Sequence, residues 1–230
     1  MSSVDVLHED NHLIIVNKSA GDITQGDSTG DKTLPDKIKD WLKEKYKKPG
    51  NVFLGVIHRL DRPTSGVIAF AKTSKALSRM NELFKAKEVE KTYWAIVEQK
   101  PKVDKGTLVD YLKKNKSQNK SYSVGKNVKG AKESILDYEL ISQSDKYFLL
   151  EVHPKTGRHH QIRTQLSNIG CIIKGDLKYG AKTSNKDGGI SLHARNLKFI
   201  HPVSQEKLSI TAPVPKTNLW HFFENNLNKI

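Results

Sequence analysis

The stretch VFLGVIHRLDRPTSGVIAFA, residues 52–71, places a polar loop between two short apolar segments. Val52–Ile57 and Gly66–Ala71 have the length and composition of buried strands, and Pro63 and Gly66 are typical of a loop between them. Polar loops that join buried strands often carry functional groups. Residues 58–65 are therefore the first candidate for a functional site.

The segments on either side of this stretch extend the strand pattern. Val4–Leu7 and Leu13–Val16 flank a polar turn and predict a hairpin at the start of the chain. Further strands are predicted at residues 92–97, 135–141, 147–152, 192–200 and 208–211. Because these strands follow one another with few helices between them, we expect an α+β fold with a mixed, mainly antiparallel sheet flanked by helices.

Four segments have the spacing of helices. They are Thr33–Lys48, a helix capped by Thr73 or Ser74, Thr156–Ile169, and Asn218–Leu227. Gly170 is placed to end the third of them. This third helix would present an unusually basic face to solvent or to a ligand.

The segment Lys100–Lys132 has ten lysines and two aspartates with little periodicity. We expect it to be a mobile, lysine-rich insert between strands. The chain has 230 residues, which favours one large domain over residues 1–230.

Composition limits the partners and the compartment. Lys and Arg number 39 against 25 Asp and Glu, giving a net charge of +14, which favours a polyanion and above all a nucleic acid. No apolar run is long enough to span a membrane, and the first residues lack the pattern of a signal peptide. A single cysteine, Cys171, excludes an internal disulfide. We expect a cytoplasmic protein.

Three clusters carry the candidate chemistry: residues 58–62, residues 91–94 and residues 156–163. Each has a plain structural interpretation as well. Asp61 is also the kind of residue that bonds the amides of its own turn, and Tyr93 is a typical strand residue. A basic helix is also commonly just a solvated face.

Taken together, the clusters favour a reactive carboxylate. Arg59 and Arg62 flank Asp61 and favour its ionised form, which nucleophilic attack requires. Arg163 can hold a carboxylate in a bidentate pair if its helix packs against the loop. The residues alone leave open an RNA glycosidase or nuclease, although no second carboxylate or metal-ligand cluster is evident near Asp61.

The motifs resemble those of the RluA family of pseudouridine synthases. The likeness runs in order through Leu13–Gly21, His58–Phe70, Lys91–Val97 and Glu151–Gly180, and continues into the strands near residues 192–202. HRLDRPTSG and TGRxHQIR, about ninety residues apart, are the most specific of these motifs.

The resemblance implies a role for each matching residue. Asp61 would be the nucleophile, Tyr93 the aromatic side chain that stacks on the target base, and Arg163 the arginine that pairs with the nucleophile. Substrate-binding residues would be Arg59, Arg62, His58, Arg158, His160 and Gln161. Of these, His58, His160 and Gln161 would shape the pocket rather than transfer protons.

The resemblance also implies a pseudouridine-synthase-like fold and the isomerisation of uridine in RNA. The base would be flipped out of its stack, and no nicotinamide, flavin, ATP or metal would be needed. Ribosomal RNA would be the favoured target and transfer RNA the alternative. We expect a monomer without the N-terminal S4-type RNA-binding domain that many relatives carry, because the first motif begins within twenty residues of the start.

Departures from the family pattern are mild. Ser19, Thr164-Gln165 and Cys171-Ile172 stand where relatives commonly have Pro, Val-His and His-Pro. These changes affect the expected choice of substrate rather than activity. A non-catalytic RNA-binding relative is the other alternative, and the intact Asp61, Tyr93 and Arg163 disfavour it.

Overall fold

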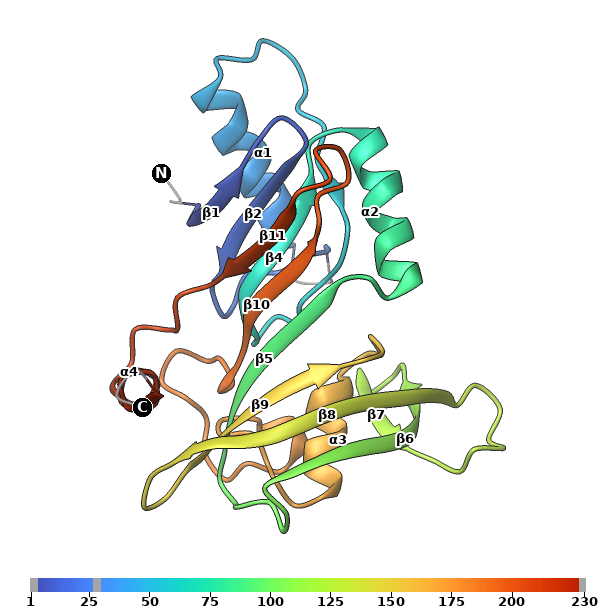
Figure 1. The fold of residues 1–230 in the computed structure, drawn as a ribbon, viewed down its shortest axis with the longest axis vertical. Coiled ribbons are helices and arrows are strands. Elements are labelled where there is room, and N and C mark those ends of the chain that lie inside the picture. The colour runs from blue at the N-terminus through green and yellow to red at the C-terminus, as the bar shows by residue number, and fades with distance from the viewer. Residues whose placement is uncertain (1–3, 27–29, 228–230) are drawn as a thin grey trace. The chain divides into compact units, whose positions relative to one another are not determined.

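The computed structural model describes residues 4–26 and 30–227 and divides into two compact units. The first unit comprises the described residues up to Lys91 together with Ala194–Pro213. The second comprises Thr92–His193 and the described residues from Val214 onward. Figure 1 shows the elements of each unit along the chain.

The first unit is built on a ladder of paired strands. Its elements are β1 (Val6–Glu9), β2 (Leu13–Lys18), β3 (Gly55–Val56), β4 (Ser65–Ala71), β10 (Leu192–Ile200) and β11 (Lys207–Thr211). The order is β1-β2-β4-β10, with β3 paired to β4 and β11 to β10. Strand β2 pairs with β4 from Leu13 opposite Ala71 to Lys18 opposite Gly66. The predicted hairpin is confirmed, whereas the strand predicted over residues 52–57 is only two residues long.

Two helices complete the first unit. Helix α1 (Leu34–Lys45) begins after Thr33, whose hydroxyl accepts a hydrogen bond from the Asp36 amide, and α2 (Ser74–Ala86) begins in the same way after Thr73. A threonine in this position satisfies an amide that the first turn leaves without a partner. Both predicted helices and their threonine caps are confirmed.

The second unit contains the remaining strands and helices. Its elements are β5 (Glu90–Val97), β6 (Lys105–Asn115), β7 (Lys120–Ser123), β8 (Lys132–Gln143), β9 (Phe148–Pro154), α3 (Gln161–Asn168), the 3₁₀ turn η1 (Leu177–Tyr179) and α4 (Asn218–Leu227). The strands lie in the order β5-β9-β8-β6-β7, and the pairs β5–β9, β9–β8, β8–β6 and β6–β7 are antiparallel.

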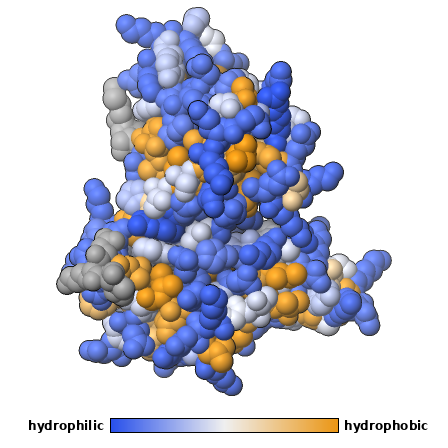
Figure 2. All heavy atoms as spheres, in the orientation of Figure 1, coloured by the Kyte–Doolittle hydropathy of each residue, from blue (hydrophilic) through white to orange (hydrophobic). Residues whose placement is uncertain are grey.

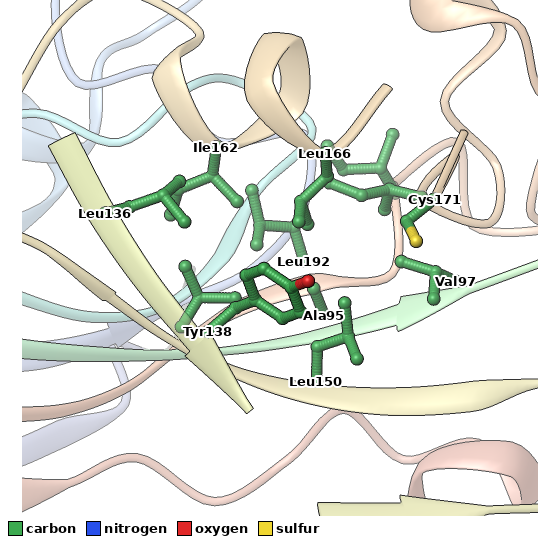
Figure 3. Close-up of a cluster of buried hydrophobic side chains, with 12 residues drawn as sticks. Ala95, Val97, Leu136, Tyr138, Leu150, Ile162, Leu166, Cys171 and Leu192 are labelled. Atoms are coloured by element: carbon green, nitrogen blue, oxygen red, sulfur yellow. The ribbon is translucent and has the colours of Figure 1, made fainter. Parts of the chain in front are cut away.

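Alternation along β5 divides the core of the second unit between two faces. Ala95 and Val97 belong to the cluster that contains Ile162 and Leu166 of α3, as Figure 3 shows. Trp94 and Ile96 join the cluster formed with Trp220 and Phe223 of α4. Neighbouring residues of a strand point to opposite faces, so one strand contributes to both clusters.

Residues 100–132, predicted as an insert between strands, themselves contain the strands β6 and β7. In β6 the inward positions include Gly106, Leu108, Asp110 and Leu112. Asp110 accepts a hydrogen bond from the Gln165 side-chain amide of α3, at 2.9 Å. A glycine and an aspartate at inward positions remove the apolar alternation that identifies a strand in a sequence.

The predicted start of the third helix is also wrong, since α3 begins at Gln161 rather than at Thr156. The Gln161 side-chain oxygen accepts hydrogen bonds from the Arg158 amide and the Thr156 hydroxyl and thereby holds residues 156–160 in a turn. His160 adopts a left-handed backbone with φ of 53°. Arg158 and His159 therefore lie before the helix.

Most of the other predicted boundaries agree closely with the structure, and the α+β class with its mainly antiparallel sheet is confirmed. Strand β10 and helix α4 match residues 192–200 and 218–227.

Figure 2 shows a face on which hydrophilic side chains predominate, with apolar side chains in separate patches. Among the helices of residues 4–26 and 30–227, none is long and apolar enough to cross a membrane.

Candidate active site

A buried lysine holds the loop that carries Asp61 in place. Lys18, at the end of β2, is 1% exposed. Its ammonium group donates hydrogen bonds to the carbonyl oxygens of Ser19, Arg62 and Thr64, at 3.0, 3.1 and 2.7 Å. Two of these acceptors lie directly beyond Asp61, so Lys18 determines the path of the loop.

Further contacts from the same region hold the loop on both sides of Asp61. The Gly21 amide donates to the Arg62 carbonyl at 2.9 Å, and the Thr24 hydroxyl donates to the Leu60 carbonyl at 3.2 Å. Within the loop, the Thr64 amide donates to the Asp61 carbonyl at 3.0 Å. The half-buried Asp61 carboxylate is thus presented by a backbone that neighbouring residues constrain closely.

The charge of Lys18 also acts on this loop. Burial lowers the pKa of Lys18 from 10.5 to about 8, and the negative charges of Asp22 and Asp61 oppose that shift. The two carboxylates therefore stabilise the charged form of Lys18.

The remaining polar residues of the motif have separate partners. The exposed Arg62 guanidinium forms an ion pair with Asp31 at 2.7 Å, and Arg59 donates to the Gln25 side chain. His58 accepts a hydrogen bond from the Ala69 amide at 3.0 Å and stacks on Phe84. Burial lowers the pKa of His58 to about 3, so this histidine is neutral near pH 7.

Gly66 allows β4 to approach the neighbouring strand closely. Its φ is 115°, and a Cβ atom built there would lie 2.2 Å from the Ala194 carbonyl oxygen of β10. Contacts this short are not tolerated, and a side chain disfavours the backbone conformation as well. The glycine that follows the functional loop is therefore required by packing.

In the second unit, Tyr93 lies on β5 opposite Val152 of β9. It is half-buried and packs against the cluster that includes Ile162 and Leu166. Trp94 points to the other face, where its indole nitrogen donates to Glu151 at 3.2 Å. The tyrosine therefore belongs to the face of the sheet that α3 covers.

Arg163 is buried on α3 and bound to Asp176 by two hydrogen bonds. Its Nε donates to one carboxylate oxygen of Asp176 at 2.7 Å and an Nη donates to the other at 2.8 Å. The side chains of Arg163 and Asp176 are 5% and 1% exposed. Because residues 161–166 are all buried, the expectation that α3 offers a basic face to solvent is wrong.

Arg163 thus forms a bidentate pair with Asp176 within the same unit, whereas the sequence predicts such a pair with Asp61. Asp61 and Arg163 belong to different units, and the proposed pairing of these two residues stays a prediction. The same holds for the stacking role of Tyr93.

A buried polar network surrounds the Arg163–Asp176 pair. The Tyr179 ring lies 5.1 Å from the Arg163 guanidinium carbon. The Tyr179 hydroxyl accepts from the Ser121 amide at 2.9 Å, donates to the Ser121 carbonyl at 3.1 Å and lies 3.0 Å from His160 Nδ1. Burial, followed by the charge of Arg163, lowers the pKa of His160 to about 2, so His160 is neutral.

The other residues predicted to bind substrate have structural partners in the second unit. The Gln161 side chain is occupied within its own turn and also donates to the Ile135 carbonyl at 3.0 Å. The exposed Arg158 donates through Nε to the Glu133 carbonyl at 3.0 Å. Arg158 is therefore the member of this group that is most accessible to a ligand.

Sequence reasoning missed Lys18, Asp176 and Tyr179. All three lie inside the motifs quoted above, but no local pattern distinguishes a buried lysine that binds carbonyl groups from an exposed lysine. Asp176 and Tyr179 stand between Gly175 and Gly180, which suggests only a turn. Their function in the fold depends on contacts across the second unit.

Metal ligation and thiol chemistry receive no structural support in the described residues. In ranges 4–26 and 30–227, no group of three or more His, Cys, Asp or Glu side chains is arranged to hold a metal ion. Cys171 is fully buried in the cluster beneath α3, and burial raises the pKa of its thiol to about 11. It is a packing residue.

Comparison with known proteins identifies the family. The sequence profile of the family described as RNA pseudouridylate synthase matches residues 12–168. The chain belongs to this family. As an RNA pseudouridylate synthase it is an isomerase, and the resemblance seen in the sequence motifs is confirmed.

Curated relatives include enzymes named for two kinds of RNA. The chain is 31% identical to tRNA pseudouridine synthase C of Vibrio cholerae over 91% of its own length and 90% of that protein. It is 32% identical to ribosomal large subunit pseudouridine synthase C of Buchnera aphidicola over 98% of its length and 70% of that protein. It spans about two thirds or more of the curated relatives it matches.

A solved structure supports the fold. The chain matches human RNA pseudouridylate synthase domain containing 4 with a TM-score of 0.78 and 24% identity. The match covers 97% of this chain and 93% of the human one. The pseudouridine-synthase-like fold expected from the motifs is confirmed.

Proposed function

We propose that this RNA pseudouridylate synthase isomerises a specific uridine of structured ribosomal or transfer RNA through Asp61. The N1–C1′ bond of the nucleotide breaks, the uracil turns, and a C5–C1′ bond forms. N1 gains a proton and the hydrogen at C5 is lost to solvent. The product therefore has the mass of the substrate and the reaction needs no redox partner or group donor.

The observation that carries this proposal is the constrained loop around Asp61. Lys18, Gly21 and Thr24 together hold the carbonyl groups of residues 60, 62 and 64. A reactive group held in one geometry avoids the entropic cost of finding that geometry in the transition state.

Tyr93 and Arg163 complete the proposed catalytic set. Flipping a uridine out of its stack costs a few kcal/mol, and stacking on an aromatic ring returns about 1–3 kcal/mol. We assign this stacking to Tyr93. We assign to Arg163 the stabilisation of the ionised nucleophile, since a guanidinium binds a carboxylate through two parallel hydrogen bonds.

Affinity for RNA would come mainly from cations. We propose that Arg59, Arg62 and Arg158, all exposed, contact phosphate groups, together with the lysines of β6 and β7. His58, His160 and Gln161 would shape the pocket through the internal contacts described above. Phosphate contacts position an RNA without reading its sequence.

Relatives named for transfer RNA and for ribosomal RNA both match this chain. We retain ribosomal RNA as the favoured target and transfer RNA as the alternative, with the enzyme acting as a monomer in the cytoplasm. Mapping pseudouridines in both RNA classes from cells with and without the gene decides between them. A site that disappears from one class identifies the target.

The catalytic assignment is tested with RNA that carries tritium at C5 of uridine, because forming the C5–C1′ bond releases the label. Wild-type protein is expected to release tritium and leave the RNA length unchanged. Asp61→Asn is expected to abolish release while RNA affinity changes no more than a few-fold. Asp145→Asn, at an exposed turn, serves as the matched control and should behave as wild type.

Each alternative predicts a different result in this assay. A glycosidase would release uracil from the RNA, and a nuclease would shorten the RNA. An RNA-binding protein without activity would bind the RNA and release no label. Near wild-type activity of Asp61→Asn would refute the nucleophile while leaving the isomerase class intact.

A further inference from the structure

Burying the Arg163–Asp176 ion pair costs an unusual amount of desolvation free energy for a purely structural contact. Both side chains are almost completely buried, and removing two charges from water is expensive even when they pair well. Apolar residues of similar size commonly give equal or greater stability. A buried arginine held by a carboxylate in this way is therefore better explained by a use for the guanidinium than by stability.

The geometry shows how such a use is possible. Asp176 engages Nε and one Nη of Arg163, that is, two of the five N–H groups of the guanidinium. Asp176 thereby fixes the plane of the group, which carries three further N–H donors. Tyr179 limits movement on the face of that plane, 5.1 Å from the central carbon.

Asp176 is itself rigidly placed. Its carbonyl oxygen accepts hydrogen bonds from the amides of Tyr179 and Ala181, both at 3.0 Å, and its amide donates to the Ile173 carbonyl at 3.0 Å. Gly175 and Gly180, on either side, have positive φ values of 85° and 110°. The carboxylate therefore projects from a tight turn rather than from a flexible loop.

Asp176 is an acidic partner that holds the Nε side of the arginine through both of its carboxylate oxygens. Tyr179 is held by Ser121, Thr164 and His160, and the neutral His160 adds no competing charge. The described contacts of the Asp176 carboxylate are both with Arg163. A change at Asp176 thus acts on the arginine before it acts on anything else.

We propose that Asp176 is a positioning residue for the isomerisation, which aims the Arg163 guanidinium. This inference rests on the proposed function, in which Arg163 stabilises the reacting carboxylate. Misplacing a reacting or stabilising group by about 1 Å can cost on the order of 100-fold in rate. Loss of Asp176 should therefore slow the chemical step more than it weakens RNA binding.

The test measures single-turnover tritium release and RNA affinity at a temperature at which circular dichroism shows each variant to be folded. Asp176→Asn is expected to lower the rate roughly 10- to 100-fold, with RNA affinity changed by no more than a few-fold. Asp176→Glu keeps the charge but displaces the guanidinium by the length of one methylene group. Compared with Asp176→Asn, it should recover the wild-type melting temperature more fully than the wild-type rate. Asp110→Asn, which alters a half-buried carboxylate bonded to Gln165 and not to Arg163, should leave the rate unchanged.

A double-mutant cycle separates positioning from general damage. In an Arg163→Lys background, Asp176→Asn should cause little further loss of rate, because the group that Asp176 positions is already absent. Additive losses, a full rate in Asp176→Asn, or rates that follow melting temperature across all variants would overturn the inference. Wild type that forms no pseudouridine overturns the proposed function instead, whereas active wild type with fully active Asp176→Asn overturns only the role of Asp176.

Discussion

Single residues show how closely stability and chemistry are joined in this protein. Arg163 and Lys18 are both buried cations, and each is stabilised by a different kind of acceptor. Arg163 has a carboxylate partner in Asp176, whereas Lys18 has three backbone carbonyl groups. The two cations therefore respond differently to substitution and to pH.

Replacing Arg163 by Met should cost about 3–5 kcal/mol of unfolding free energy, because it leaves the Asp176 carboxylate buried without its partner. The fall should appear in chemical denaturation as a lower midpoint. Arg158→Met removes an exposed guanidinium from a neighbouring turn and should change stability by less than about 1 kcal/mol. Equal stability of the two variants would contradict the buried ion pair.

Replacing Lys18 by Met should also destabilise the fold at pH 7, although it removes a buried charge. A pKa of about 8 instead of 10.5 corresponds to roughly 3 kcal/mol of unfavourable desolvation. Hydrogen bonds from a charged donor contribute about 1.5–3 kcal/mol each, and Lys18 makes three. The lost bonds therefore outweigh the relief of burial.

The same residue makes stability depend on pH. The folded state holds the Lys18 proton less tightly than the unfolded state, so between pH 8 and 10.5 the unfolded chain binds more protons and the Lys18 contribution to stability rises with pH. The unfolding free energy of wild type minus that of Lys18→Met should therefore increase across this range. A constant or falling difference would show that the Lys18 pKa is not lowered.

At the scale of elements, the strands that were predicted well are those whose residues reveal their environment locally. Strand β4 is buried along its whole length and consists of small and apolar residues, so its sequence predicts it directly. Strand β6 was missed because Gly106 and Asp110 occupy inward positions and Asp110 is satisfied from α3. Its identity as a strand depends on a partner far along the chain.

The same reasoning explains the misplaced start of α3. A left-handed histidine has no clear signal in a sequence, and the side chain that holds the turn, Gln161, looks like an ordinary helical residue. The positions of Asp61, Tyr93 and Arg163 in elements followed from motifs. The partner Asp176 did not, because thirteen residues and a glycine turn separate it from Arg163.

Strand packing at Gly66 gives a prediction at the same scale. Gly66→Ala should strongly lower the melting temperature or prevent folding, because the new methyl group would overlap the Ala194 backbone. Gly50→Ala, with nothing within 4 Å of the added methyl group and no positive φ, should have little effect. Thermal unfolding of the two variants compares them directly, and similar melting temperatures would contradict the close approach.

For the whole molecule, the net charge of +14 is the dominant long-range property. Three exposed lysines lie at and beyond the end of β6: Lys113 and Lys114 are in the strand, and Lys116 is in the turn that leads to β7. Their placement on a defined element makes their contribution to RNA binding testable against lysines elsewhere.

Changing Lys113, Lys114 and Lys116 to Gln should weaken RNA binding and reduce its dependence on salt. Each lost phosphate contact should lower the slope of log K against log salt by about 0.7 for single-stranded RNA. Lys43, Lys48 and Lys75, exposed on or near α1 and α2, give a control with the same change in net charge. Identical slopes for the two triple variants would show that the net charge, rather than the β6 end, determines affinity.

The ammonium group of Lys18 binds the carbonyl groups of Arg62 and Thr64, which lie 44 and 46 positions further along the chain. The loop that carries Asp61 therefore acquires these contacts only when β2 and β4 have paired. A chain truncated directly after Asp61 would hold that aspartate while Lys18 lacked two of its three carbonyl acceptors.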